Sequence, residues 1–272
     1  MPHMHPPSDD LAIAHALADL ARTAILPHFR ALDGVEDKVG RPHFDPVTIA
    51  DKNAEAAMRE RLAVVRPDDG VLGEEFPNTP GTSGRTWILD PVDGTRGFLM
   101  GLPTWGTLIA LSPGSGQSPT IGIMDQPYVG ERFFAHGGEA AWQRDGAPRP
   151  IHTRRCDGLG AALVATTSPD LFSDGGAPRF RRLQARVRMV RFGTDCYAYA
   201  LLAAGHIDIV MEEGLRAFDI APFVPLIEAA GGVVTDFSGR PIGPTLPDAF
   251  HGEVLALGDP SLLPAALDAI NG

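Results

Sequence analysis

Apolar residues recur at helical spacing in two early segments of the chain. The first segment covers residues 8–30, where Ser8 can cap the helix and acidic residues follow in its first turn. The second begins near Asp51 and ends by Pro67, because proline cannot continue a helix. Two helices are therefore predicted before residue 70.

The middle of the chain changes to short apolar runs separated by glycine, proline and serine. This pattern predicts closely spaced strands. The expected strands are 71–72, 86–89, 105–111, 120–125, 131–135 and 140–143. We expect the strand 86–89 to stop where the turn-forming segment 90–95 begins, because that segment contains a proline and a glycine.

Beyond about residue 150, predicted strands alternate with predicted helices, which favours a layered α/β arrangement. The strands are expected at 161–166, 187–191, 207–211, 232–236 and 253–257, and the helices at 195–205, 219–230 and 260–270. The length of 272 residues fits either a single domain or two tightly joined halves. We expect halves at 1–150 and 151–272 that form one compact unit.

Composition narrows the choice of partners. The chain has a formal net charge of −11, which argues against a nucleic acid or an anionic membrane as the main partner. The acidity suits a protein that concentrates divalent cations, and it equally suits solubility alone. Cys156 and Cys196 form no disulfide framework, the first residues lack the apolar core of a signal peptide, and no run is long enough for a membrane span. These features together predict a cytoplasmic protein.

Asp90 and Asp93 are the strongest candidates for chemistry. They follow an apolar strand and stand three residues apart across a turn, so both carboxylates can point toward one place. Magnesium takes a few carboxylate ligands together with water and phosphate oxygens. Pro91 fixes one backbone dihedral angle, and Gly94 permits the backbone conformation of a tight turn. The alternative is an ordinary acidic surface turn.

Further carboxylates join this pair. Glu74 follows a predicted strand and can supply another ligand, whereas Asp219 and Asp51 stand at predicted helix starts, where capping is the simpler explanation. Together with the hydroxyl of Thr95, such groups can orient and deprotonate an attacking water beside a metal pair. Phosphoryl transfer requires mainly positioning and charge neutralisation, so no nucleophilic cysteine or serine is needed.

Four segments occur in the order of a known family. The segment 87–95, with Asp-Pro-Val-Asp-Gly-Thr at its core, resembles the first signature of the inositol monophosphatase superfamily. The segment 218–232 resembles the second signature, with Phe218 in place of the usual tryptophan. Segments 73–75 and 45–51 resemble the upstream ligand element and the D-x-V-T-x-x-D stretch, where Ala50 replaces the common hydroxyl residue. The four segments span most of the chain.

The resemblance implies a layered α-β-α-β-α sandwich that binds two or three Mg²⁺ ions. Glu74, Asp90, Asp93 and the carbonyl of Val92 would hold the first ion. Asp90, Asp93 and Asp219 would hold the second, and Glu74 would contribute to a weaker third. The family also implies a homodimer.

The resemblance assigns further roles around these ions. Thr95, Asp51 and Glu74 would be the catalytic residues, with Thr95 and Asp51 activating the water. Backbone amides of Gly94 and Thr95 would face the phosphate. The predicted substrate contacts are Asp93, Gly94, Thr95, Asp195, Glu212 and Asp219.

The leaving alcohol is the remaining question. Asp195 and Glu212 flank the predicted site, and an added carboxylate favours a positively charged substrate, although Asp195 can equally cap its helix. Segments 101–111, 122–127 and 195–199 resemble the histidinol-phosphate phosphatases of the superfamily. The first interpretation is a phosphatase of L-histidinol phosphate in histidine biosynthesis. The alternatives are a phosphatase of inositol or another sugar alcohol phosphate, and a catalytically silent scaffold of the same fold.

Overall fold

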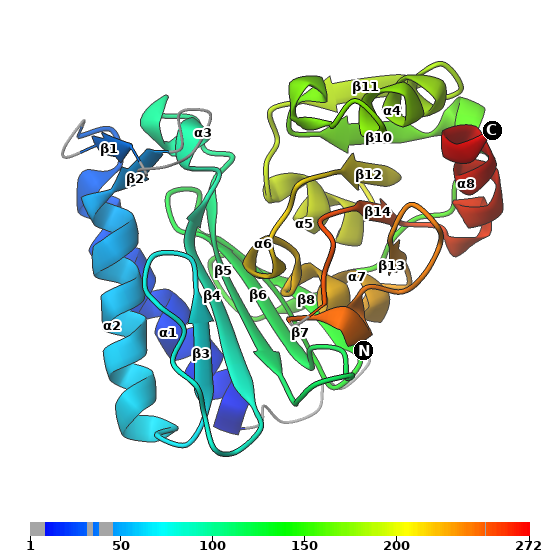
Figure 1. Cartoon of the computed structure of the whole chain (residues 1–272). Coiled ribbons are helices and arrows are strands. Elements are labelled where there is room, and N and C mark those ends of the chain that lie inside the picture. The colour runs from blue at the N-terminus through cyan, green and yellow to red at the C-terminus, as the bar shows by residue number, and fades with distance from the viewer. Residues whose placement is uncertain (1–8, 32–34, 38–45, 248) are drawn as a thin grey trace.

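The computed structural model describes residues 9–31, 35–37, 46–247 and 249–272. Its larger sheet has seven strands in the order β3-β4-β5-β6-β7-β8-β9, with β3 and β4 parallel and every other neighbouring pair antiparallel (Figure 1). The strands are β3 (Gly70–Gly73), β4 (Thr86–Asp93), β5 (Gly106–Ser112), β6 (Ile121–Gln126), β7 (Glu131–His136), β8 (Glu139–Gln143) and β9 (Arg149–Pro150).

The smaller sheet has five strands in the order β11-β10-β12-β14-β13. Strand β10 pairs in parallel with β11 and β12, whereas β14 is antiparallel to β12 and β13. These strands are β10 (Leu163–Thr166), β11 (Met189–Phe192), β12 (Ile209–Glu212), β13 (Val233–Thr235) and β14 (Val254–Leu257). A separate two-stranded pair joins β1 (Val35–Asp37) and β2 (Pro46–Thr48).

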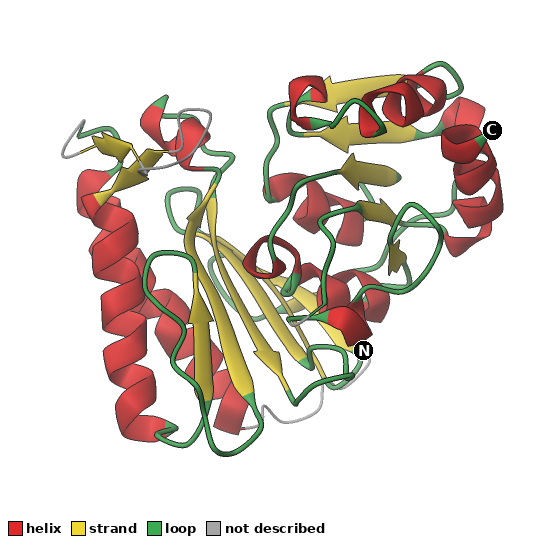
Figure 2. Cartoon of the chain, viewed as in Figure 1, coloured by secondary structure: helices red, strands yellow, loops and turns green. Residues whose placement is uncertain are grey.

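Helices form three layers around the two sheets (Figure 2). Helices α1 (Asp9–Ile25) and α2 (Ile49–Val65) cover one face of the larger sheet. Between the sheets lie α5 (Tyr197–Ala203), α6 (Ala217–Ile220) and α7 (Phe223–Ala229), and the outer face of the smaller sheet carries α4 (Gly176–Gln184) and α8 (Leu263–Asn271). The order of layers is the predicted α-β-α-β-α sandwich. A short helix, α3 (Thr95–Leu99), follows β4.

Short 3-10 helices complete the regular structure. They are Leu26–His28, Leu159–Ala161, Pro169–Leu171, Gly243–Thr245 and Pro260–Leu262. Within the described ranges, no helix is long and apolar enough to cross a membrane.

Strand β4 is apolar on both faces because helices cover both faces of its sheet. Trp87 and Leu89 belong to the cluster beneath α1 and α2, whereas Ile88 belongs to the cluster around the central helices. This alternation is the period of two that a strand imposes, and both faces are buried. It also places Asp90 on the same face as Ile88, toward the central helices.

The expectation that a turn ends this strand at residue 89 is wrong. Strand β4 continues to Asp93, and its register with β5 shifts between Asp90 and Asp93. A shift of this kind absorbs the proline within the ladder, since bulges are positions where a strand tolerates one. The two aspartates therefore stand on a strand and not on a free loop.

Other elements differ from the sequence predictions. The helix expected over 219–230 is two helices, α6 and α7, with Pro222 between them. The predicted opening helix ends earlier, at Ile25, and its expected cap Ser8 lies outside the described residues. The pattern did not predict α3, α4, β1, β2 or β9.

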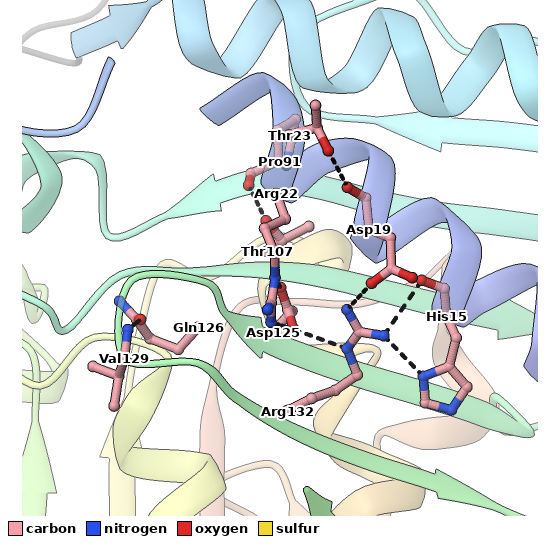
Figure 3. A network of polar contacts seen from close by, with 10 residues as sticks. All are labelled: His15, Asp19, Arg22, Thr23, Pro91, Thr107, Asp125, Gln126, Val129 and Arg132. Carbon is pink, nitrogen blue, oxygen red and sulfur yellow. Dashed lines mark hydrogen bonds and ion pairs between the residues drawn. The ribbon is translucent and has the colours of Figure 1, made fainter. Parts of the chain in front are cut away.

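A partly buried ionic network connects α1 to the larger sheet (Figure 3). The Asp125 carboxylate on β6 is fully buried and accepts hydrogen bonds from Arg22 and Arg132, each at 2.8 Å. Arg132 also reaches Asp19 at 2.7 Å and the Nδ1 atom of His15 at 3.1 Å, both on α1. Since a guanidinium can only donate, the His15 ring must be neutral.

One hydrophobic cluster contains residues from both sides of residue 150. Ile88 and Leu108 pack in it together with Tyr199 and Val224. The division into halves 1–150 and 151–272 remains a prediction.

Candidate active site

Three carboxylates meet at the end of β4. One oxygen from each of Asp90, Asp93 and Asp219 lies within 4.8 Å of the others. Asp90 and Asp93 come from β4, and Asp219 comes from α6, which packs against that strand. Asp90 is almost completely buried, with 1% of its surface exposed. The structure thus brings together three of the predicted metal ligands.

Two backbone amides orient this cluster. The Arg216 N–H donates to Oδ2 of Asp219 at 2.6 Å, which closes the first turn of α6. The Cys196 N–H donates to Oδ2 of Asp93 at 2.8 Å. The N-cap residue of α6 is Arg216 and not Asp219 as the sequence alternative had it, but the Asp219 carboxylate caps the Arg216 N–H from the third helical position and lies in the cluster as well. The two functions are compatible because a carboxylate has two oxygens.

Glu74 and Asp51 approach the same cluster from β3 and α2. Glu74 directly follows β3, and its negative charge raises the pKa of both Asp90 and Asp51. Oδ2 of Asp51 accepts hydrogen bonds from the Thr48 backbone N–H at 3.0 Å and from the Thr48 hydroxyl. Its other oxygen, Oδ1, is buried and has no hydrogen-bond partner. Capping of the helix therefore uses only one of the two oxygens of the Asp51 carboxylate.

The cluster is electrostatically strained without a cation. Burial and the charges of Glu74, Asp93 and Asp219 raise the pKa of Asp90 well above its usual value. Burial and the charges of Asp219 and Asp195 do the same to the pKa of Asp93. Burial raises the pKa of Asp219 to about 7, and burial raises that of Asp51 to about 6. Like charges in a poorly solvated site favour protonation unless a positive charge compensates them.

The donor set fits a hard divalent cation. Oδ1 of Asp90 is buried without a hydrogen-bond partner, as is Oδ1 of Asp51. Buried carboxylate oxygens are normally hydrogen-bonded or coordinated, and Mg²⁺ and Ca²⁺ both prefer oxygen ligands. A cation bound among these carboxylates would satisfy the orphaned Asp90 oxygen and relieve the mutual repulsion.

The turn after β4 requires glycine at one position. Gly94 has a φ of +79°, and a Cβ there would lie 3.0 Å from Cβ of Asp195. The left-handed conformation and the close approach both exclude a larger side chain. The next residue, Thr95, donates its hydroxyl to the carbonyl of Val92 at 3.0 Å. A carbonyl oxygen has a second lone pair, so this bond leaves Val92 able to accept another partner.

A pocket of about 170 Å³ opens beside the cluster. Five carboxylates line it, and its remaining wall combines apolar side chains with the hydroxyl residues Thr166, Thr167 and Ser168. The acidic residues are Asp93, Asp195, Glu212, Glu213 and Asp219, and the apolar wall includes Leu171, Phe172, Tyr199 and Leu215. This lining combines negative charge with a surface on which a small ring can pack.

Glu212 and Asp195 are fixed in different ways. Glu212 accepts hydrogen bonds from the Thr167 N–H at 2.8 Å, the Thr167 hydroxyl at 2.6 Å and the Tyr199 hydroxyl at 2.9 Å. Asp195 has a positive φ of 42°, and its Oδ2 accepts from the Thr104 hydroxyl at 3.2 Å.

The alternative of Asp195 as the side-chain cap of α5 is therefore wrong. Helix α5 begins at Tyr197 after Cys196, and no side chain caps it. The Asp195 carboxylate turns to Thr104 at the pocket instead.

Several supporting residues escaped the sequence analysis. Thr104 and Thr167 orient the two pocket carboxylates, and Glu213 lies in the pocket wall. Thr104 and Tyr199 stand within the segments 101–111 and 195–199 that the sequence singled out, and Glu213 directly follows the predicted Glu212. Thr167 lies 45 residues before Glu212, so no local spacing could indicate their contact.

The layered fold and the acidic cluster are those of one family of known proteins. The sequence profile of the inositol monophosphatase family matches residues 7–266. The chain belongs to this family, whose members include named phosphatases, and it is a phosphoric monoester hydrolase.

Individual relatives are known as histidinol-phosphatases or as inositol monophosphatases. The chain is 37% identical over 240 residues to a histidinol-phosphatase of Streptomyces coelicolor, covering 86% of this chain and 88% of that protein. It is 39% identical over 231 residues to the chloroplastic bifunctional phosphatase IMPL2 of Arabidopsis thaliana, covering 84% of this chain and 64% of the plant protein. An inositol monophosphatase from Zymomonas mobilis superposes with a TM-score of 0.82 at 39% identity, over 97% and 98% of the two chains.

Proposed function

We propose that the protein is a Mg²⁺-dependent phosphatase that hydrolyses L-histidinol phosphate to L-histidinol and phosphate. The observation that carries this proposal is the position of the acidic pocket, which adjoins the carboxylate cluster. The cluster suits a cation and the transferred phosphate, whereas the pocket suits the alcohol that leaves.

The metal ligands in this proposal are the carboxylates of the cluster. Asp90, Asp93 and Asp219 would hold Mg²⁺ together with Glu74 and the carbonyl of Val92. Bound Mg²⁺ would neutralise phosphate charge and make water a better nucleophile. Two or three ions per site are expected from the family resemblance.

The remaining steps belong to the side chains themselves. The Thr95 hydroxyl is held by the Val92 carbonyl at 3.0 Å, which fixes its position at the start of α3. Asp51 has a free acceptor oxygen and a raised pKa of about 6, so it can take a proton from the attacking water near neutral pH. The backbone amides of Gly94 and Thr95 would face the phosphate. Thr95, Asp51 and Glu74 are the proposed catalytic residues.

The pocket favours a cationic alcohol. Asp195, Glu212 and Glu213 line the pocket and are not among the three clustered carboxylates, so in this proposal they remain available to a cationic group. Histidinol carries an amine and an imidazole ring, and both can contact a carboxylate or an aromatic wall. The histidinol-phosphatase relative supports the same choice.

The second candidate is a phosphatase of inositol or another sugar alcohol phosphate. The likeness to the Zymomonas mobilis inositol monophosphatase favours it, because that likeness covers nearly the whole chain. The hydroxyl groups of a sugar alcohol could also donate to Glu212.

Parallel assays of phosphate release from L-histidinol phosphate and myo-inositol 1-phosphate test this proposal. The expected result is a kcat/KM for L-histidinol phosphate that is at least about tenfold higher, equivalent to about 1.4 kcal/mol. A preference for myo-inositol 1-phosphate would keep the chemistry and reject the substrate. No hydrolysis of either ester, or of a wider panel, would favour the silent scaffold.

We also propose a cytoplasmic homodimer with no nucleic-acid or membrane partner. The net charge of −11 and the family resemblance support these points. Light scattering after size exclusion should give twice the 28.9 kDa mass of one chain.

A further inference from the structure

A buried carboxylate lies directly beneath the segment that carries Glu74. Glu55 on α2 is fully buried and stands one helical turn after Asp51. Its two oxygens accept hydrogen bonds from the backbone N–H groups of Glu75 at 2.8 Å and Phe76 at 3.3 Å. The Nε of Arg59, one turn further along the helix, donates to the same carboxylate at 2.7 Å.

Arg59 holds the other side of this segment. Its two Nη atoms donate to the Thr79 hydroxyl at 3.0 Å and to the Phe76 carbonyl at 3.4 Å. The centre of its guanidinium lies 6.0 Å from the centroid of the Phe76 ring. Glu55 and Arg59 on α2 therefore form hydrogen bonds with both N–H and C=O groups of the backbone that follows Glu74.

The end of β3 also touches the Glu55 carboxylate. A Cβ placed on Gly73 would lie 2.0 Å from Oε1 of Glu55. Only glycine allows the strand to approach this closely. Glu55 thus contacts the residue before Glu74 and hydrogen-bonds the residue after it.

We propose that Glu55 and Arg59 are positioning residues that set the divalent-cation affinity of the cluster through Glu74. The pair fixes the backbone on both sides of Glu74, so that its carboxylate reaches the cluster at little conformational cost. A buried ion pair is a weak source of stability by itself, whereas groups that orient metal ligands commonly change metal affinity about 10–100-fold. The inference rests on the proposed function, because it requires Glu74 to be a ligand.

Calorimetric titration of Mg²⁺ into metal-free protein tests this role without relying on turnover. The variant Glu55→Gln keeps the size of the side chain but replaces one acceptor oxygen with an NH₂ group. One amide of the 75–76 backbone then loses its partner.

Asp208→Asn provides a matched control. Asp208 is also buried, accepts a backbone N–H from Leu163 at 2.7 Å and pairs with Arg154 at 2.6 Å. It precedes β12, whereas Glu212 at the pocket is the last residue of that strand. Both substitutions remove comparable interactions, but only one of them adjoins a proposed ligand.

We expect Glu55→Gln to raise the Kd for Mg²⁺ at least about tenfold, and Asp208→Asn to change it less than about twofold. At saturating Mg²⁺ the turnover of Glu55→Gln should approach that of the wild type, whereas a damaged fold would lower turnover at every concentration. Equal Kd values for the two variants would overturn the positioning role.

Arg59→Lys tests the same inference if Glu55→Gln does not fold. Lysine keeps the positive charge beside Glu55 but cannot reproduce the contacts to Thr79 and the Phe76 carbonyl. A severalfold rise in Kd is expected, and an unchanged Kd would overturn the inference. Absence of saturable Mg²⁺ binding to the wild type would reject the proposed function itself. Normal binding in the wild type and in all variants would reject only the positioning role.

Discussion

The cluster of carboxylates around the end of β4, of which Asp90 is buried and the other two are half-buried, is costly for the metal-free protein. Asp90, Asp93 and Asp219 lie within 4.8 Å of one another, and each has a raised pKa. A cluster of this kind weakens the fold unless a cation binds, so the same residues oppose folding and support function. This tension makes substitutions at the cluster informative.

Asp90→Asn should separate the two effects. Removing one charge from the cluster should leave the melting temperature of the metal-free protein equal or higher, because repulsion falls. Turnover should drop at least about a thousandfold, since a shared ligand contributes several kcal/mol to transition-state stabilisation. Phosphate release and thermal unfolding with and without Mg²⁺ measure the two effects. A folded variant with near-normal turnover would contradict the ligand assignment.

Asp195→Asn should change substrate preference more than catalysis. The substitution removes a negative charge from the pocket wall but keeps the size of the side chain. We expect kcat/KM for L-histidinol phosphate to fall at least about fivefold further than kcat/KM for myo-inositol 1-phosphate. Thr104→Val is the matched control, because it removes the hydrogen bond to Asp195 without changing charge. Equal losses on both substrates would show that Asp195 has no role in charge recognition.

The sequence predicted the functional residues that belong to a recognisable motif. The two signature segments predict Asp90, Asp93 and Asp219 as partners, and the structure brings them together. Thr167 belongs to no motif, and segment 101–111 gives no sign that its Thr104 contacts Asp195. The two threonines contact the pocket carboxylates only because the fold brings segments 91 and 45 residues apart into contact.

At the scale of helices and strands, the spacing of hydrophobic residues along the chain predicted most strands and the two long helices. It failed where tertiary packing overrode a local signal. Pro91 lies within β4 because the shifted register accommodates it, and the short helix α3 follows directly at Thr95. Helix α4 was missed because arginines dominate its sequence and few apolar positions mark its period.

The attachment of α1 to the sheet predicts a specific pH response. Burial and Arg132 lower the pKa of His15 to about 4 from an ordinary value of 6.5. Between these values the unfolded state binds the proton and the folded state does not, so the His15 contribution to stability is lost as pH falls from about 6.5 toward 4.

Replacement of His15 should weaken this pH response. We expect the free energy of unfolding of the wild type to fall on the order of 1–2 kcal/mol more than that of His15→Asn between about pH 7.5 and about pH 5. Urea denaturation of both proteins at the two pH values gives this difference. The contributions of the other titrating groups are the same in both proteins, so they cancel. Parallel pH curves would show that His15 is not buried as a neutral ring.

On the scale of the whole molecule, the acidic cluster links stability to pH in the opposite direction. The folded-state pKa values of Asp51 and Asp219 are raised to about 6 and about 7. Their contribution is fully present below the unfolded value of 3.8 and is lost as pH rises through about 6 to 7.

Mg²⁺ should reverse this loss, because its ligands must be deprotonated. We expect the rise in melting temperature caused by Mg²⁺ to be small near about pH 5 and to grow toward about pH 8. Thermal unfolding of the metal-free and Mg²⁺-saturated protein across this range provides the measurement. A stabilisation that does not depend on pH would place the bound cation away from the cluster.

The most direct test of the account is the rate of phosphate release from L-histidinol phosphate as Mg²⁺ is added to metal-free protein. We expect a rate that rises to saturation with Mg²⁺, disappears when EDTA is added and returns with excess Mg²⁺. A rate that EDTA does not change would contradict the central claim that the carboxylate cluster acts through a bound metal ion.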